Sequence, residues 1–191
     1  MFSTKFAIAA ISAAQVVAHG AGYNLRTASN EVPYPPPPAI SYHLHIVFNL
    51  DDPTSLPAAL ALRDEAREHF SDLLGEDCDG RYDNARLCLI YDHDVSQATF
   101  GPFFSGEWSV FVPVAYVNTV LFWFTQRYTE VPTASLLLHP NTGYEYEDHS
   151  EWALWGGGAQ ALNMSIFEQG VMTNEFDQYP GSPENPVCLP L

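Results

Sequence analysis

The amino-acid sequence predicts an α+β protein of the ferredoxin-like type, a βαββαβ sandwich with an antiparallel four-stranded sheet and an irregular C-terminal extension. The hydropathy pattern divides the chain into segments in the order strand, helix, strand, strand, helix, strand. Because crossover connections between strands are right-handed, this order favours a sheet with its strands arranged four, one, three, two. The first and last strands should therefore lie side by side.

The first half of this pattern begins with a strand at Ser41–Asn49, where aromatic and β-branched residues alternate in SYHLHIVFN. A helix is expected from Pro53 to Leu74, because leucines and Phe70 form an apolar stripe among Arg and Glu, and Gly75 ends it. The segment Arg86–Tyr91 is the second predicted strand.

The second half repeats the alternation of strand and helix. Phe103–Val112 is the third predicted strand, and Pro113 then suits the first turn of a helix whose apolar face comes from Val114–Tyr128. Thr133–Leu138 is the fourth strand. After Ser182 the prolines of SPENPVCLPL disfavour regular structure, so this tail is expected to be irregular.

Two segments precede the predicted domain, and the chain of 191 residues is long enough for one such domain. Residues 1–18 combine a basic residue, a short apolar run and small residues before a cleavage point, which is typical of a signal peptide. Residues 19–40 form a proline-rich leader. We therefore expect a secreted, extracellular protein whose ferredoxin-like domain and tail occupy residues 41–191.

The charge balance restricts the partners of the protein. It has 7 basic and 23 acidic residues, so a phosphate-rich surface would repel it. No segment beyond the signal peptide offers about 20 uninterrupted apolar residues. Neither a nucleic acid nor a membrane is therefore expected as a partner, whereas a homodimer stays open.

The three cysteines predict one disulfide and one free thiol in an oxidising compartment. The sequence does not choose the pair. Cys88 lies in LCLIYD, which resembles a buried strand, and for this reason we favour a bond between Cys78 and Cys188.

Histidines provide the main chemical signal. His43 and His45 are two residues apart in the first predicted strand, so their side chains lie on the same face and can converge on one metal ion. His139, at the end of the neighbouring fourth strand, can join them. A turn is predicted at Pro140-Asn141-Thr142-Gly143, and it would bring His149 back over the sheet as a further ligand or acid–base group. Glu107 is the best carboxylate if the site is two histidines and one acid around iron.

Plainer interpretations stay open for each of these residues. A histidine in a strand is often a hydrogen-bonded core residue, and YEYEDH alone reads as an acidic solvated loop. His69 is expected at the surface of a helix and His93 in a turn. Cleavage after Ala18 would also make His19 the N-terminal residue, which could bind copper as in the secreted polysaccharide monooxygenases. Those enzymes are β-sandwiches, and the helix-containing pattern of this chain does not fit one.

The sequence resembles the DOPA 4,5-dioxygenase family in YHLHIVF, in LCLIYD, in Trp123 and Arg127, and above all in SLLLHPNTGYEYEDHSEWALW. The resemblance covers about Tyr42 to Trp155. It implies a ferredoxin-like fold and extradiol cleavage of a catechol or related phenol, a small aromatic substrate, with non-haem Fe(II) or another divalent metal. By position it implies His43 and His139 as leading metal ligands and His45 and His149 as ligand or acid–base residues.

The chain departs from the family pattern at three places. The Gly-Pro-His-Pro segment corresponds here to VSQATFGPF, a histidine before ALW is replaced by Trp152, and an acidic residue after HPNTG is replaced by Tyr144. An alternative function is therefore a relative that keeps the sheet and binds a metal or an aromatic ligand without turnover.

Overall fold

The computed structural model of the chain describes residues 38–39, 41–75, 86–90, 102–142 and 144–168. The predicted signal peptide, leader and C-terminal tail lie outside these residues, as do His19, His93, Cys78, Cys188 and most of the VSQATFGPF stretch. No helix in the described ranges is long and apolar enough to cross a membrane.

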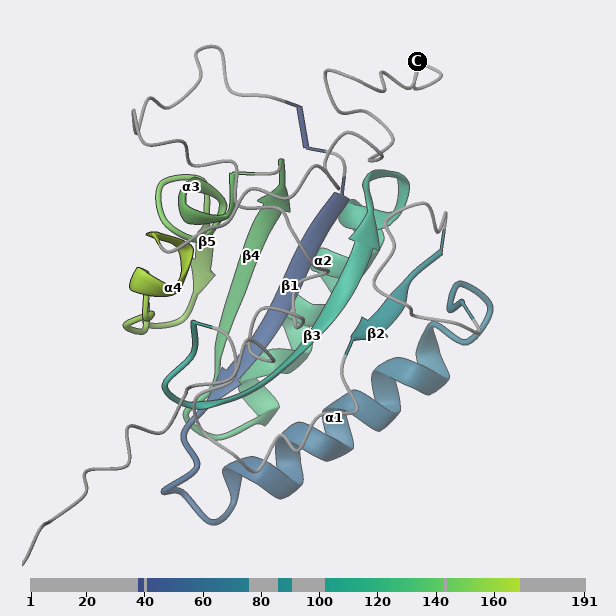
Figure 1. Cartoon of the computed structure of the whole chain (residues 1–191). Helices are drawn as coiled ribbons and strands as arrows, with labels where there is room; N and C mark the ends of the chain where they lie inside the picture. The colour runs from purple at the N-terminus through teal and green to yellow at the C-terminus, as the bar shows by residue number, and fades with distance from the viewer. Residues whose placement is uncertain (1–37, 40, 76–85, 91–101, 143, 169–191) are drawn as a thin grey trace, which may run out of the picture.

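An antiparallel sheet of five strands forms the centre of the molecule (Figure 1). Its strands lie in the order β2-β3-β1-β4-β5. The bounds are Ser41–Phe48 for β1, Cys88–Ile90 for β2, Gly106–Pro113 for β3, Ser135–Asn141 for β4 and Leu154–Gly156 for β5. The predicted order four, one, three, two is thus present, but the prediction of a four-stranded sheet missed β5, which pairs with β4 along only three residues.

Two long helices cover one face of the sheet. They are α1, Ser55–His69, and α2, Val117–Arg127, which follows a short 3₁₀ turn at Val114–Tyr116. Alternate β1 residues Leu44, Ile46 and Phe48 point toward them and pack with Ala59 and Leu62 of α1 and Val120 and Phe124 of α2. This layer is the main hydrophobic core, and it leaves the odd-numbered β1 residues for the opposite face.

The opposite face of the sheet carries polar residues under a cover of short elements. These are α3, Glu145–His149, and α4, Ser165–Glu168, together with the bridge between Phe103 and Leu162. Ser41, His43 and His45 are buried on this face, although all three are polar. A face so rich in buried polar groups is expected only where those groups serve one another or a ligand.

Several predicted boundaries were wrong. β3 begins at Gly106 rather than Phe103, and Pro113, predicted to open the second helix, ends β3 instead. The first helix ends at His69 rather than Leu74, and β4 continues beyond Leu138 to Asn141. Pro140 and Asn141 pair with Tyr42 and Ser41 of β1, while β5 pairs with β4 only as far as Leu138. In the part of the chain that the structure describes, β5 does not reach Pro140, so the missing N–H of Pro140 breaks no hydrogen bond to β5. His139 lies within β4 rather than at its end.

Cys88 is buried in β2 and is disulfide-bonded, with a partner outside the described residues. The favoured Cys78–Cys188 bond, which left Cys88 as the free thiol, is therefore wrong. An apolar strand position buries a half-cystine as readily as a thiol, and the sequence pattern did not separate the two.

Candidate metal centre

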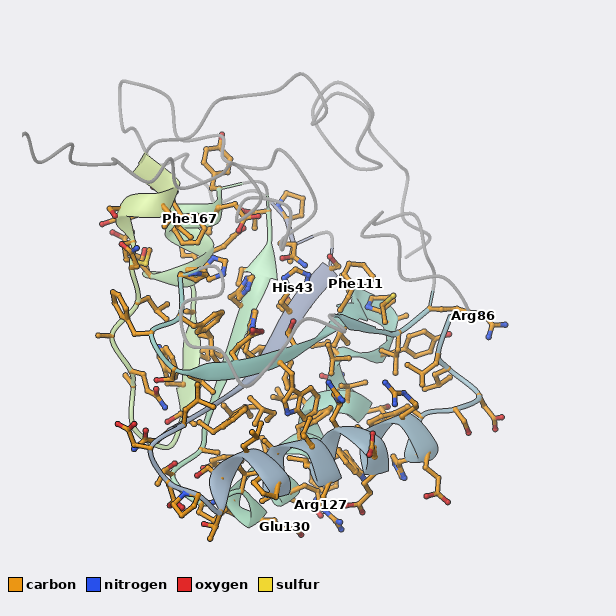
Figure 2. The ribbon with its side chains drawn as sticks, turned by 60° about the horizontal axis from the view of Figure 1, so that its bottom comes forward. His43, Arg86, Phe111, Arg127, Glu130 and Phe167 are labelled. Atoms are coloured by element: carbon orange, nitrogen blue, oxygen red, sulfur yellow. The ribbon has the colours of Figure 1, made fainter. Side chains whose placement is uncertain are left out.

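Three histidines meet on the face of the sheet that the long helices leave open. His43 and His139 are direct partners in the pairing of β1 with β4, and His45 is the next β1 residue on the same face. One ring nitrogen from each lies within 4.8 Å of the others, and all three residues are buried. Figure 2 separates His43, Phe111 and Phe167 on this side of the sheet from Arg127 and Glu130 on the other. The sequence prediction of converging histidines is thus borne out in its geometry.

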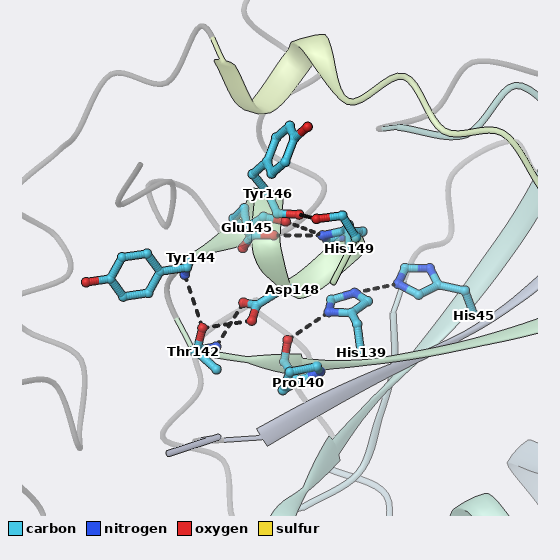
Figure 3. Close-up of polar contacts among 10 residues, drawn as sticks. His45, His139, Pro140, Thr142, Tyr144, Glu145, Tyr146, Asp148 and His149 are labelled. Atoms are coloured by element: carbon cyan, nitrogen blue, oxygen red, sulfur yellow. Dashed lines mark hydrogen bonds and ion pairs between the residues drawn. The ribbon is translucent and has the colours of Figure 1, made fainter. Parts of the chain in front are cut away.

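The tautomer of His139 follows from its hydrogen bond. Its Nδ1 lies 2.9 Å from the backbone oxygen of Pro140 (Figure 3). A carbonyl oxygen only accepts, so Nδ1 must carry the proton and donate it. In the neutral ring Nε2 then presents a lone pair.

His45 has the same arrangement with a different partner. Its Nδ1 lies 2.9 Å from Oε1 of Glu107, and both residues are buried. An ionised carboxylate only accepts, so Nδ1–H of His45 donates the hydrogen bond to it, and the lone pair of the neutral ring is on Nε2. Metal-binding histidines commonly donate their second ring nitrogen to a carboxylate or a backbone carbonyl in this way.

The two Nε2 atoms lie close to each other. Nε2 of His45 and Nε2 of His139 are only 3.1 Å apart. Two acceptors at this distance repel unless a proton or a metal ion lies between them. Ligand bonds of about 2.0–2.1 Å place two neighbouring nitrogens of one ion about 3.0–3.4 Å apart, so the histidines fit a divalent metal.

His149 lies over this cluster from α3. Its ring centroid is 3.8 Å from that of His139. The Nδ1 proton donates to the backbone oxygen of Glu145 at 2.8 Å, which leaves Nε2 as the basic nitrogen. The predicted return of a second histidine after the HPNTG turn is therefore present, although His149 is outside the group that could share one ion.

Acidic side chains surround His149, and the interpretation of YEYEDH as a solvated loop is wrong. The segment forms α3, with Glu145, Glu147 and Asp148 buried. Burial, and then the charge of Asp148, raise the pKa of the Glu145 carboxyl well above its ordinary value of 4.5. Phe167 of α4 packs on this segment at His149, and the local sequence does not reveal this contact.

Aromatic rings close the cluster at both ends. Phe103 packs against His45 with centroids 4.8 Å apart, and Phe167 of α4 packs against His149 at 4.7 Å. Both phenylalanines are buried. They keep water from the imidazoles and lower the local dielectric, which strengthens any charge interaction inside. Sequence reasoning did not find either residue for the site, because a single phenylalanine carries no signal beyond hydrophobicity.

Other predicted positions lie elsewhere. His69 is exposed at the end of α1, where its ring stacks on Trp123 with centroids 5.2 Å apart. Trp152, in place of the family's histidine, is partly exposed, and its ring lies 6.3 Å from that of Tyr144. Glu107 is brought to the site through His45 and is outside the group of three histidines.

The chain is similar to known proteins. The model of the Dopa 4,5-dioxygenase family matches residues 42–166, which include β4, all of β1 except Ser41, and the histidines His43, His45, His139 and His149. A solved structure from Nostoc punctiforme, described as a "putative dioxygenase", is 22% identical, covers 69% of this chain and 93% of its own, and has a TM-score of 0.48. No curated protein matches the chain. Because the family model spans more than half of the sequence, the chain belongs to the Dopa 4,5-dioxygenase family.

Proposed function

We propose that the protein is a secreted, metal-dependent dioxygenase that cleaves the ring of a catechol or a related phenol beside its two hydroxyl groups. The observation that carries the proposal is the pair of Nε2 atoms of His45 and His139, 3.1 Å apart, with both Nδ1 protons engaged by acceptors. Family membership supplies the reaction class. The ferredoxin-like fold class is part of the proposal and is supported by the order of the first four strands.

His43, His45 and His139 are the proposed ligands, and Fe(II) is the proposed ion. This set differs from the sequence prediction, because His45 takes the place of Glu107. Glu107 instead holds the His45 ring in the ligating tautomer. Imidazole nitrogens suit iron, zinc and copper alike, so the preference for iron comes from the family. When bound, the ion would supply a Lewis acid for the two phenolic oxygens and a redox partner for dioxygen.

His149 is the proposed acid–base residue. Its Nδ1 proton is held by the carbonyl of Glu145, so Nε2 can accept a phenolic proton from the substrate and later return it. The aromatic walls formed by Phe103 and Phe167 suit a planar ring and keep bulk water from the proton transfer.

The test is a turnover assay on the full secreted chain loaded with Fe(II) under anaerobic conditions. Addition of air-saturated buffer and a catechol should give a yellow ring-cleaved product, and His139→Gln should abolish it. His69→Gln removes an exposed histidine and is the matched control. A panel of catechols without any product from the iron-loaded wild type would contradict the proposal.

A second candidate function is favoured by the position of Trp152. The ring lies against Tyr144 rather than among the histidines, so among the described residues Trp152 does not supply the imidazole that the family has at this position. The protein would then bind a metal or an aromatic ligand without turnover. Stoichiometric metal binding and catechol binding, both without oxygen uptake, would favour this function over the first.

Secretion is a separate part of the proposal and rests on the pattern of residues 1–18. Expression of the full chain in a eukaryotic host should place the protein in the medium. Mass spectrometry should show a mature N-terminus near His19, and retention of residues 1–18 in an intracellular product would contradict secretion.

A further inference from the structure

A polar clamp connects the end of β4 to α3. Thr142 follows β4 directly, and its backbone N–H donates to Oδ2 of Asp148 at 2.9 Å while its hydroxyl donates to Oδ1 at 2.7 Å. Both residues are buried. The two bonds are to a carboxylate and are shielded from water, which makes them stronger than ordinary neutral hydrogen bonds.

The same threonine also connects to the residue that opens α3. The N–H of Tyr144 donates to Oγ1 of Thr142 at 3.3 Å, so the hydroxyl accepts one bond while it donates another (Figure 3). A helix of five residues has little stability of its own, and no side chain caps the N-terminus of α3. The location of α3 therefore depends on such tertiary contacts.

The clamp acts on the residue next to it. Asp148 immediately precedes His149, whose ring lies 3.8 Å from that of His139. Thr142 is only three residues beyond His139 in the same segment. One end of the clamp is thus fixed to the strand that carries His139, and the other end is fixed to the helix that carries His149.

We propose that Thr142 and Asp148 are positioning residues that set the place of His149 Nε2 over the cluster of His43, His45 and His139. The proposal rests on the proposed function, because it assigns a purpose to the acid–base role of His149. The described bonds of the clamp join Thr142, Tyr144 and Asp148. The three imidazoles of the cluster are held by the pairing of β1 with β4, so loss of the clamp should slow proton transfer at His149 and leave the metal in place.

The experiment compares four variants of the full chain loaded with Fe(II). Thr142→Ser keeps the hydroxyl and the N–H, so its kcat should stay within about twofold of wild type, whereas Thr142→Val loses the hydroxyl bond. Thr142→Val and Asp148→Ala should lower kcat by about 10–100-fold, with KM and iron content unchanged, because small displacements of a reacting group have effects of this size. The kcat of Asp148→Asn should lie between that of Thr142→Ser and those of Thr142→Val and Asp148→Ala.

A second readout does not depend on turnover. The Nδ1 proton of His149 is buried and donates to a carbonyl, so ¹⁵N-histidine NMR of the diamagnetic zinc-loaded protein should show it as a slowly exchanging signal that His149→Gln removes. Thr142→Ser should keep the slow exchange, and Thr142→Val and Asp148→Ala should accelerate it by at least about tenfold, as expected for local opening. If Thr142→Val does not fold, Thr142→Ser and Asp148→Asn still test the proposal. Asp148→Asn should then have the lower kcat and the faster proton exchange of the two.

The proposal and the proposed function can fail separately. A wild type without turnover removes the dioxygenase function, and the exchange of the His149 proton still tests the clamp. Unchanged kcat and unchanged exchange in Thr142→Val and Asp148→Ala would overturn the clamp. So would a parallel loss of iron content and melting temperature in Asp148→Asn and Asp148→Ala, because that result marks a general structural role.

Discussion

His43 and His139 face one another directly across the β1–β4 pair, with ring centroids 5.2 Å apart. Their separation is set by the pairing of two central strands, so it does not rely on a loop. Strand pairing of this kind holds side chains more precisely than a surface connection does. The metal centre proposed here is therefore expected to exist before any ion arrives.

Removal of one histidine of this pair should remove tight metal binding. In His43→Gln the amide no longer offers an imidazole lone pair, and the affinity for Fe(II) should fall by more than the about 10–100-fold that a lost supporting partner costs. Isothermal titration with Fe(II) or Co(II) measures it. His69→Gln is the control, and a His43→Gln protein with wild-type affinity would show that the ion is held elsewhere.

Glu107 provides a test of ligand against supporting residue. If it orients His45 through the 2.9 Å contact with Nδ1, Glu107→Gln should lower metal affinity by about 10–100-fold and keep the stoichiometry. If Glu107 were instead a direct ligand, Glu107→Gln should abolish metal binding at this site. Metal titration of Glu107→Gln beside His45→Gln separates the two, and an equal loss in both variants would return Glu107 to the ligand set predicted from the sequence.

Glu145 should make the protein less stable as the pH rises. Its folded-state pKa is raised by burial and by Asp148, so above about pH 4.5 the unfolded chain releases a proton that the folded protein keeps. The contribution of Glu145 is fully present below its unfolded pKa and is lost as the pH rises through its folded pKa. The slope of this loss is at most about 1.4 kcal/mol per pH unit for one proton.

Glu145→Gln cannot ionise and should lack this loss. The free energy of unfolding of Glu145→Gln minus that of wild type, measured by urea denaturation, should therefore be larger at pH 7 than at pH 4. Glu151→Gln is exposed and controls for the removal of one acidic residue from the chain. Equal differences between Glu145→Gln and wild type at both pH values would show that Glu145 is ionised in the folded protein.

Gly106 should not accept a side chain. A Cβ there would lie 2.5 Å from Cε2 of Phe48, and Phe48 is fully buried and cannot turn away. Gly106→Ala should lower the free energy of unfolding by about 1–3 kcal/mol, as overpacking does. Chemical denaturation measures it. At Gly158 a Cβ would meet nothing within 4 Å, so Gly158→Ala is the matched control, and an equally stable pair would contradict the packing around Phe48.

The sequence predicted the sheet because β1 and β4 have strong strand patterns and because handedness limits how such strands can connect. The spacing of His43 and His45 placed both on one face, and strand order then placed His139 beside them. The period of a strand and the order of a sheet are general properties, so this part of the site followed from them.

The remaining parts depend on contacts that the local sequence does not contain. YEYEDH is rich in acidic residues and is therefore typical of a solvent-exposed loop. In the structure Phe167 and the end of β4 bury it. β5 is three residues long and carries too little pattern to be detected. The hydroxyl of Thr142 has many partners in a turn, and only the fold selects Asp148.

The pairing of β1 with β4 joins segments about a hundred positions apart in the sequence, 41–47 with 135–141. Closing contacts of such long range costs more chain entropy than closing local ones, which slows folding. The three imidazoles come together only where β1 and β4 are paired. An ion held by all three imidazoles would therefore bind the folded protein in preference to the unfolded chain, so its binding would stabilise the fold against global unfolding.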